Sequence, residues 1–470
     1  MSTTTQAIVI GSGPGGYVCA IRLAQLGVKT VVVELGELGG VCLNVGCIPS
    51  KALITASKHY QATGKKLAEM GILVDGARVE MGTMQAWKAG VVKKLTSGVG
   101  TLLKGNGVTV VRGKARFVAA DTLEVTDPSG ATQRLQAPAI VVATGSRPTP
   151  IPAFPVDQEH VLDSTGALAL SEVPKRLVVI GGGYIGLELG GVFARLGAQV
   201  TVLELMPQLL PGFDLDLVRP VEKGLKKAGA EVLTETRAVS WRKADDGNGL
   251  SVTVQVKDVT RELRCDKILV TVGRRPNSDG LGLESLGVDI DRGGFIKVDS
   301  RLETSVPGVY AIGDVAGNPM LAHKASKEGE VVAEVIAGKP SVWDVRGIPA
   351  VVFTDPEIAT VGLTEAEAKA KGHTVRVGKV PFAGLGRAMT TGETEGFARV
   401  VADAKTHALL GVQIVGPEAS DLIAEAGLAL EMGAYADDVG LTIHAHPTLA
   451  EAVMEAAKAA TGEAIHLMNR

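Results

Sequence analysis

The chain has 470 residues, which is too long for one hydrophobic core and predicts roughly three domains. Its 59 glycines and 46% hydrophobic content are typical of a glycine-punctuated α/β enzyme and exclude a disordered or fibrous protein. Lysine and arginine number 48 against 51 aspartate and glutamate, so the net charge of -3 indicates neither a nucleic-acid footprint nor a polybasic membrane patch.

The N-terminal stretch is uncharged as far as Arg22, which raises the question of a signal peptide. A signal peptide needs a basic start and an unbroken apolar core, whereas glycines interrupt residues 11–16. No later segment offers the ~20 uninterrupted apolar residues of a membrane span. The four cysteines are too few for a disulfide scaffold, and Cys19 and Cys265 are expected to be core thiols. We therefore expect a reducing compartment, the cytoplasm or, in a eukaryote, the mitochondrial matrix.

Residues 7–34 read as a strand, a glycine turn, a helix and a second strand. This is the context in which a dinucleotide fingerprint binds its ligand. Gly11, Gly13 and Gly16 let backbone N–H groups approach a pyrophosphate at the helix N-terminus. Glu34 ends the second strand and would accept hydrogen bonds from ribose hydroxyls.

The next segment, residues 39–51, reads GGVCLNVGCIPSK. A regular helix would place the Cα atoms of Cys42 and Cys47 beyond the roughly 7 Å limit for a disulfide, so Gly46 would supply a local distortion. Pro49 stands where a proline can open a helix, which would leave Cys47 near a helix N-terminus that stabilises a thiolate. The segment predicts a redox-active disulfide on a cofactor. The spacing alone leaves two buried free cysteines as an alternative.

Residues 177–204 repeat the first plan, with Gly181, Gly183 and Gly186 in the turn and Glu204 after the second strand. In both segments the acid stands 23 positions after the first glycine of the turn. If the glycines served only to allow close packing of helix and strand, the recurrence of an acid at the same position in both segments would have no explanation. The chain is therefore predicted to bind two dinucleotides.

The second acid predicts which dinucleotide binds there. A carboxylate such as Glu204 accepts from a 2′-hydroxyl and repels a 2′-phosphate, and no arginine occurs in residues 205–207 to receive that phosphate. NAD is thus expected at the second site in preference to NADP. FAD is then the natural occupant of the first.

Three further apolar stretches are predicted to be strands. Residues 140–145 and 268–273 end in glycine where each nucleotide domain would close, and residues 310–314 end in Gly-Asp. After about Arg346, strand-like stretches precede apolar helical ones, which predicts a separate α+β domain that serves as an assembly surface.

Further motifs extend over the chain: ATGSRP (143–148), GGGYIGLELG (181–190), GRRPN (273–277), AIGD (311–314), LAHKAS (321–326), TDPEIATVG (354–362) and HAHPTLAE (444–451). With GGVCLNVGCIPSK they cover the whole chain. The chain resembles the flavin-dependent pyridine nucleotide disulfide oxidoreductases, and among them the branch that oxidises dihydrolipoyl groups.

Glutathione reductase-like members usually carry Val-Pro-Lys-Lys after the second cysteine, where this chain has Ile-Pro-Ser-Lys. A mercuric reductase would need an extra cysteine pair near the C-terminus, and this sequence has none there. The chain departs from the family pattern at Val41, usually Thr, at Ser326 and Lys327, often acidic, and at Ala450, usually Ser.

The resemblance implies two cofactor sites and no metal site. For FAD it implies Gly11, Gly13, Gly16, Glu34, Lys51, Gly145, Asp314 and Ala322. For NAD it implies Gly181, Gly183, Gly186, Glu188, Glu204 and Gly273, with Glu188 pairing with Lys51 beside the flavin.

The resemblance also implies roles for the reactive residues. A dihydrolipoyl thiolate would attack Cys42 and release Cys47 as the thiolate that faces the flavin. His446 would be the base that this chemistry needs at neutral pH, oriented by Glu451, while His444 would be structural. Because the base comes from the second subunit in this family, an obligate homodimer with two shared active sites is expected.

The predicted fold class is α/β, with two Rossmann-like dinucleotide-binding domains, for FAD and NAD, and a C-terminal α+β dimerisation domain. The expected boundaries are 1–148 for the FAD domain, 149–275 for the NAD domain, 276–345 for a central segment completing the FAD domain, and 346–470 for the dimerisation domain.

The expected partners are a second copy of the chain and a lipoylated acyltransferase core of a 2-oxo acid dehydrogenase complex, or a lipoylated glycine cleavage carrier protein. Nucleic acid and membrane are not expected as partners.

Two alternative functions are an NAD(P)H-dependent reductase of another disulfide, such as glutathione, and a redox-silent FAD/NAD-binding scaffold subunit. Glu204 and the residues after Cys47 disfavour the first, and the intact set of reactive residues disfavours the second.

Overall fold

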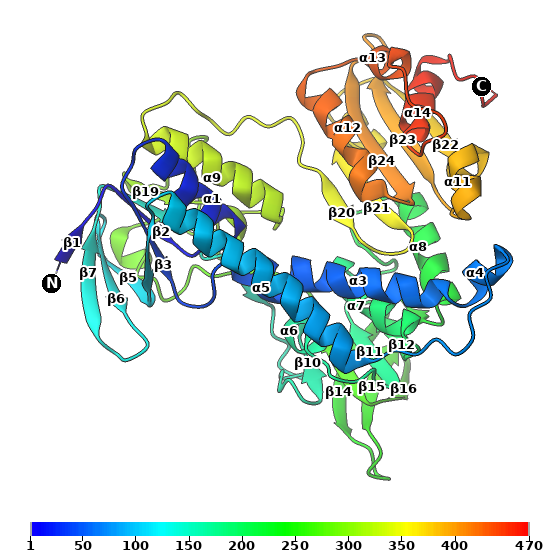
Figure 1. Cartoon of the computed structure of the whole chain (residues 1–470), viewed down its shortest axis with the longest axis horizontal. Coiled ribbons are helices and arrows are strands. Elements are labelled where there is room, and N and C mark those ends of the chain that lie inside the picture. Colours follow the sequence, from blue (N-terminus) through cyan, green and yellow to red (C-terminus); the bar gives the residue numbers. More distant parts are fainter. Residues whose placement is uncertain (1, 469–470) are drawn as a thin grey trace.

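The computed structural model describes residues 2–468 of the chain. Its elements form three bodies, two nucleotide folds and a C-terminal domain, around the helix α3 (Cys47–Ala62). The first fold lies at one end, and α3 extends from it between the second fold and the orange-red C-terminal domain (Figure 1). All three bodies therefore approach one cysteine helix.

Five parallel strands form the sheet of the first fold, in the order β19-β8-β2-β3-β4. They are β2 (Ala7–Ile10), β3 (Thr30–Glu34), β4 (Thr109–Arg112), β8 (Ala139–Val142) and β19 (Val309–Ala311). Every residue of β2, β3, β8 and β19 is buried, as expected of a parallel sheet that is covered on both faces. Because β19 follows the second fold in the sequence, the chain returns to this sheet after building the other.

Two helices, α1 (Pro14–Gln25) and α9 (Ala322–Ile336), pack against each other beside this sheet. A Cβ on Gly329 would lie 2.6 Å from the carbonyl oxygen of Gly15, so the two backbones are in direct contact. A smaller four-stranded sheet belongs to the same end of the molecule. Its strands, in spatial order, are β1 (Ser2–Thr4), β7 (Thr132–Gln136), β6 (Thr122–Thr126) and β5 (Lys114–Ala119).

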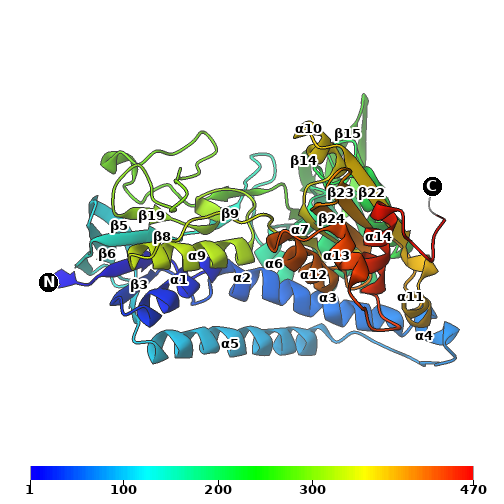
Figure 2. The same ribbon diagram turned by 90° about the horizontal axis from the view of Figure 1, so that it is seen from above.

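Between β3 and β4 the chain forms a helical segment that includes α3. Its other helices are α2 (Gly40–Val45), α4 (Lys65–Glu69) and α5 (Met81–Gly105). The long α5 contacts α3, which it crosses in Figure 1 and runs alongside in Figure 2. No helix within residues 2–468 is long and apolar enough to cross a membrane.

The second fold has five parallel strands in the order β10-β17-β11-β12-β13. They are β10 (Val161–Leu162), β11 (Arg176–Ile180), β12 (Gln199–Leu203), β13 (Glu231–Leu233) and β17 (Lys267–Val270), accompanied by α6 (Ser164–Leu168), α7 (Tyr184–Arg195) and α8 (Leu215–Lys227). An antiparallel sheet of β14 (Thr236–Lys243), β15 (Leu250–Val256) and β16 (Val259–Cys265) is attached to it. The short strands β9 (Ser146–Pro148) and β18 (Arg274–Pro276) pair where the chain passes between the two folds.

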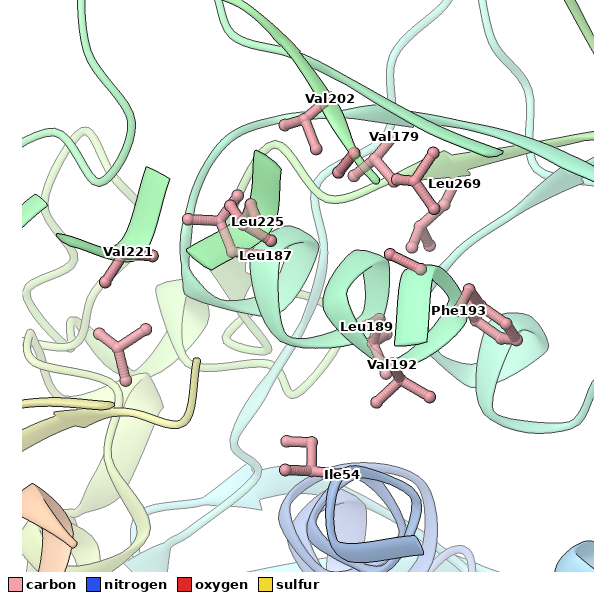
Figure 3. Packing of buried hydrophobic residues seen from close by; sticks show 14 of the residues in the cluster. Ile54, Val179, Leu187, Leu189, Val192, Phe193, Val202, Val221, Leu225 and Leu269 are labelled. Carbon is pink, nitrogen blue, oxygen red and sulfur yellow. The ribbon is translucent and has the colours of Figure 1, made fainter. Parts of the chain in front are cut away.

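The helix α7 joins the second fold to the cysteine helix. Its residues Leu189 and Val192 belong to the same buried cluster as Ile54 of α3. Figure 3 shows the Ile54 side chain directed from α3 toward α7, whose other side meets Val179 and Leu269 of the sheet. Apolar packing thus fixes α3 against the second fold.

The C-terminal domain has an antiparallel sheet in the order β20-β21-β24-β23-β22. The strands are β20 (Ala350–Val352), β21 (Glu357–Gly362), β22 (Val375–Pro381), β23 (Phe397–Asp403) and β24 (Leu409–Gly416), and the helices are α10 (Glu365–Ala370), α11 (Gly386–Thr391), α12 (Ala419–Glu431), α13 (Ala436–Leu441) and α14 (Glu451–Thr461). Leu428, Met432, Leu441 and Ile443 are exposed here, between 66% and 96%. The predicted fold class, two Rossmann-like folds followed by an α+β domain, is confirmed, and the exposed apolar residues suit an assembly surface.

Candidate active site

A cavity of about 560 Å³ lies where the first fold meets α2, α3 and the start of α7. This volume is in the range of ligand sites. The residues implied for FAD that line it are Gly11, Gly13, Glu34, Lys51, Gly145, Asp314 and Ala322, and both Cys42 and Cys47 line it as well.

The first glycine turn leaves room for a ligand at the N-terminus of α1. A Cβ on Gly11 would lie 2.5 Å from the carbonyl oxygen of Ala143, and one on Gly16 would lie 2.0 Å from that of Gly11. A Cβ on Gly13, in contrast, would meet no atom within 4 Å. Gly11 and Gly16 therefore allow the turn to close, while Gly13 opens the approach to the helix N-terminus.

Glu34 is fixed at the mouth of this turn. Its Oε2 accepts hydrogen bonds from the Ser12 N–H at 2.7 Å and the Ser12 hydroxyl at 2.6 Å, and its Oε1 accepts from the Gly36 N–H at 2.7 Å. The sequence reasoning missed Ser12, although its position inside the glycine turn was a signal. Asp314 is held in a similar way by a hydrogen bond of 2.5 Å from the Ser146 hydroxyl.

The two reactive cysteines lie on either side of a break between α2 and α3. α2 ends at Val45, and α3 begins at Cys47, with Pro49 as its third residue. Gly46, with φ -138° and ψ -111°, forms the break, and a Cβ there would lie 2.9 Å from the Val41 carbonyl oxygen. The expected distortion at Gly46 and the helix start at Cys47 are both confirmed.

Cys42 and Cys47 are not bonded to each other in this structure, and a hydrogen bond joins their side chains. The hydrogen bond from Cys42, supported by the charge of Lys51, lowers the pKa of Cys47 to about 7 against the opposing effect of burial. The same hydrogen bond and burial raise the pKa of Cys42. Of the two thiols, Cys47, with Lys51 beside it, is therefore the one that ionises more readily.

Lys51 and Glu188 form the implied pair beside the cysteines. The Lys51 Nζ lies 2.7 Å from Glu188 Oε2, and Glu188 is buried with 5% of its side chain exposed. The other carboxylate oxygen, Oε1, accepts a hydrogen bond of 3.0 Å from the Phe353 N–H. Each domain thus supplies one of these three residues.

The second glycine turn repeats the first but does not line the large cavity. A Cβ on Gly186 would lie 2.2 Å from the Gly181 carbonyl oxygen, and one on Gly183 would meet no atom within 4 Å. Glu204 accepts hydrogen bonds of 2.7 Å from the N–H groups of Gly182 and Met206.

Gly273 follows β17 with a φ of +123°, a conformation that favours glycine. The second fold reaches the cavity through α7 and β18, whose residues Tyr184, Ile185, Glu188 and Arg274 line it. Of these, only Glu188 was predicted. Tyr184 and Ile185 stand between Gly183 and Gly186 of the second fingerprint, a position that could have indicated them.

His446 and Glu451 are brought together at the start of α14, outside this cavity. The His446 Nδ1 lies 2.9 Å from Glu451 Oε1, whose other oxygen accepts from the Thr448 N–H at 2.9 Å. Burial opposes ionisation of Glu451, but the hydrogen bonds from His446 and Thr448 outweigh it and lower its pKa. The His446 side chain is 77% exposed. Within one chain, therefore, the histidine and the cysteines do not share a site.

The remaining candidates have structural partners. His444 is buried and lies 2.7 Å from a Glu425 carboxylate oxygen. Cys19 and Cys265 are fully buried, as predicted, and burial raises the pKa of Cys265 to about 12. Among residues 2–468, no group of three His, Cys, Asp or Glu side chains could hold a metal ion.

Comparison with known proteins agrees with this architecture. The family model described as pyridine nucleotide-disulphide oxidoreductase matches residues 5–329, and the dimerisation domain of the same family matches residues 348–457. The chain is 51% identical over 466 residues to a dihydrolipoyl dehydrogenase of Geobacillus stearothermophilus, covering 99% of this chain and 98% of that protein. It is 53% identical over 468 residues to one of Thermus scotoductus, covering 99% and 100%.

Two solved structures share the fold over nearly the whole chain. LpdA from Mycobacterium tuberculosis gives a TM-score of 0.90 at 27% identity, covering 96% of this chain and 99% of that one. The HOCl-induced flavoprotein disulfide reductase RclA from Escherichia coli gives a TM-score of 0.84 at 27% identity, covering 96% and 99%. From its two nucleotide folds, its cysteine pair and these matches, the chain belongs to the pyridine nucleotide-disulphide oxidoreductase family.

Proposed function

We propose that this protein oxidises protein-bound dihydrolipoyl groups to lipoyl groups with NAD as electron acceptor, the activity of a dihydrolipoyl dehydrogenase. The observation that carries the proposal is the pair of Cys42 and Cys47 in a cavity between two nucleotide folds, with Lys51 in the same cavity. Relatives about 50% identical over their full length carry the same activity in their names.

The cofactors are FAD and NAD, and the residues present fit both. The cavity, the open space at Gly13 and the fixed Glu34 suit FAD, which would be held by Gly11, Gly13, Gly16, Glu34, Lys51, Gly145, Asp314 and Ala322. NAD would be held by Gly181, Gly183, Gly186, Glu188, Glu204 and Gly273. When bound, FAD supplies two-electron transfer between the dithiol and NAD.

The thiol chemistry starts from the oxidised cysteine pair. A dihydrolipoyl thiolate attacks Sγ of Cys42, the Cys42–Cys47 bond breaks, and Cys47 leaves as a thiolate. The second lipoyl sulfur, once deprotonated, attacks the first, and Cys42 leaves and takes up a proton as the cyclic disulfide departs. The lowered pKa of Cys47 and the raised pKa of Cys42 support this division, because Cys47 is then the better leaving thiolate.

The base that removes the lipoyl protons is His446 of the partner subunit. Its exposure, and its place outside the cavity of its own chain, support a site shared between two chains. Glu451 orients the ring through the hydrogen bond to Nδ1 and leaves Nε2 to take the proton. The match to a dimerisation domain supports the homodimer that this arrangement needs.

We further propose the domain boundaries given above and a lipoylated partner, either the acyltransferase core of a 2-oxo acid dehydrogenase complex or a glycine cleavage carrier protein.

The direct test of the proposed activity uses the purified protein with dihydrolipoamide and NAD. A yellow protein that forms NADH and gains long-wavelength absorbance on reduction supports the proposal. Reduction of oxidised glutathione without any turnover of dihydrolipoamide would contradict it.

A further inference from the structure

The side chain of Lys51 has two partners from two other domains. One is Glu188 of α7, at 2.7 Å. The other is the ring of Phe353 in the C-terminal domain, whose centroid lies 4.3 Å from the Lys51 Nζ. The Phe353 N–H also donates to Glu188. A single residue therefore contacts both members of the ion pair.

Phe353 is itself held in a segment with little room to move. It follows Val352 of β20 and precedes Thr354, each 2% exposed. The Thr354 hydroxyl donates to the Pro356 carbonyl at 2.7 Å, and a Cβ on Gly224 of α8 would lie 1.9 Å from the Asp355 carbonyl oxygen. The second fold and the C-terminal domain thus clamp the segment that presents the ring.

The contact with the ring limits the freedom of the lysine. An ammonium group within about 6 Å of an aromatic centroid is attracted to the ring face. Lysine otherwise has a flexible four-carbon stem with many rotamers. Lys51 lies four residues after Cys47, so the two side chains are neighbours on one face of α3.

We propose that Phe353 is a positioning residue, whose ring and N–H hold the Lys51–Glu188 pair in the orientation in which Lys51 stabilises the Cys47 thiolate. This inference rests on the proposed function and adds to it a contribution of the C-terminal domain to the redox pair. Around Cys47, α2 supplies Cys42, α3 supplies Lys51, and α7 supplies Glu188 and Tyr184. β18 adds Arg274, which lines the same cavity and acts on Tyr184. Lys51 is the cation that acts on the Cys47 thiol, so its orientation governs how strongly the thiolate is stabilised.

The test compares Phe353→Leu with Phe353→Tyr and with a matched control elsewhere. Leucine removes the ring but keeps the N–H, and tyrosine keeps both. The control is Phe397→Leu, because Phe397 also lies under a lysine, with the Lys379 Nζ 3.6 Å from its centroid, but Lys379, unlike Lys51, does not line the cavity. Two measurements follow the Cys47 thiolate against pH: the long-wavelength absorbance of the reduced holoenzyme, and the rate at which iodoacetamide alkylates Cys47 in the reduced protein, with the alkylated residue located by peptide mass spectrometry.

In Phe353→Leu, we expect the midpoint of both curves to rise by roughly 0.5 to 1 pH unit, while Phe353→Tyr and Phe397→Leu keep the wild-type midpoint. An unchanged midpoint in Phe353→Leu, or an equal shift in Phe397→Leu, overturns the inference. Lys51→Met separates this effect from a general disturbance of the fold. The double variant Lys51→Met with Phe353→Leu should have the same midpoint as Lys51→Met alone. A further shift of the midpoint in the double variant also overturns the inference. The alkylation curve needs no lipoyl substrate, so failure of the proposed activity in wild type would be recognised separately.

Discussion

The two nucleotide folds have nearly the same turn but very different surroundings. In both, the third glycine of the turn, Gly16 or Gly186, would place a Cβ about 2 Å from the carbonyl oxygen of the first. In both, an acid, Glu34 or Glu204, accepts two backbone N–H groups. The fingerprint thus specifies the same local structure twice.

The difference lies in what packs against each helix. α1 packs against α9 of its own fold, so the first turn opens into the large cavity. α7 packs against α3 from the other fold, and this contact carries Glu188 to Lys51. The fingerprint therefore fixes where a dinucleotide can bind, and the neighbours of its helix decide which side chains meet the reacting groups.

The largest effect is expected from the feature that only the first fold has, the cysteine helix. Cys42→Ser and Cys47→Ser should each retain FAD, since neither sulfur anchors it, yet lose dihydrolipoamide oxidation to background. Only Cys42→Ser keeps the Cys47 thiolate, so only this variant should show the thiolate-to-flavin charge-transfer band. Cys265→Ala, at a buried thiol of the second fold, is the control and should keep activity. A band in Cys47→Ser alone would reverse the assignment of the two sulfurs.

The next largest effect concerns the proposed base, His446, which lies outside both nucleotide folds. His446→Gln should lower dihydrolipoamide oxidation by the roughly 10²- to 10⁴-fold typical of a lost acid-base group. NADH-driven flavin reduction needs no thiol deprotonation and should change much less. The matched control is His466→Gln, because His466 also pairs with a glutamate of α14, Glu455, at 3.0 Å.

Subunit exchange tests whether the site is shared. A mixture of inactive His446→Gln and inactive Cys42→Ser subunits forms heterodimers with one intact cysteine pair opposite one intact histidine. Such mixtures should regain up to one of two sites. Mixtures that stay inactive after exchange would place the whole site within one chain.

Much of this architecture could be predicted from the sequence, because the signals are local. The turns at Gly11 and Gly181, the break at Gly46 and the helix start at Cys47 each depend on residues within a few positions of one another. The contact of Phe353 with Lys51 could not be predicted, because 302 positions separate them and only tertiary packing joins them. The β14–β16 sheet was missed for another reason: its edge strands β14 and β16 are largely exposed and lack a continuous apolar run.

A third pair of variants tests the comparison of the two turns directly. A Cβ on Gly13 or Gly183 meets nothing within 4 Å, and their φ values of -63° and -78° suit any residue, so alanine should fit the protein and obstruct only a bound dinucleotide. Gly13→Ala should fold but weaken FAD binding by about tenfold or more, measured by reconstitution of the apoprotein. Gly183→Ala should stay yellow and raise KM for NAD by about tenfold. Loss of FAD from Gly183→Ala would show that the two turns are not independent.

The smallest effect is expected at the second acid, where ligand choice and not chemistry changes. Glu204 is 7% exposed, and one of its carboxylate oxygens would lie 3.0 Å from a Cβ on Gly182, so the side chain fills its space closely. Glu204→Arg loses the hydrogen bonds from Gly182 and Met206 and brings a positive charge to the ribose site. We expect kcat/KM for NAD to fall and that for NADP to rise, with a combined change in their ratio of about tenfold, or 1.4 kcal/mol.

Glu204→Gln separates the two causes of that change, because it keeps the shape and removes only the charge that repels a 2′-phosphate. It should lower kcat/KM for NAD less than Glu204→Arg does and still improve use of NADP. The same change in the first fold, Glu34→Arg, should cost FAD and leave the NAD to NADP ratio alone, because FAD has no 2′-phosphate form to discriminate. A wild-type enzyme that used NADP as well as NAD would contradict the role of Glu204. A shift in the ratio caused by Glu34→Arg would contradict the assignment of one dinucleotide to each fold.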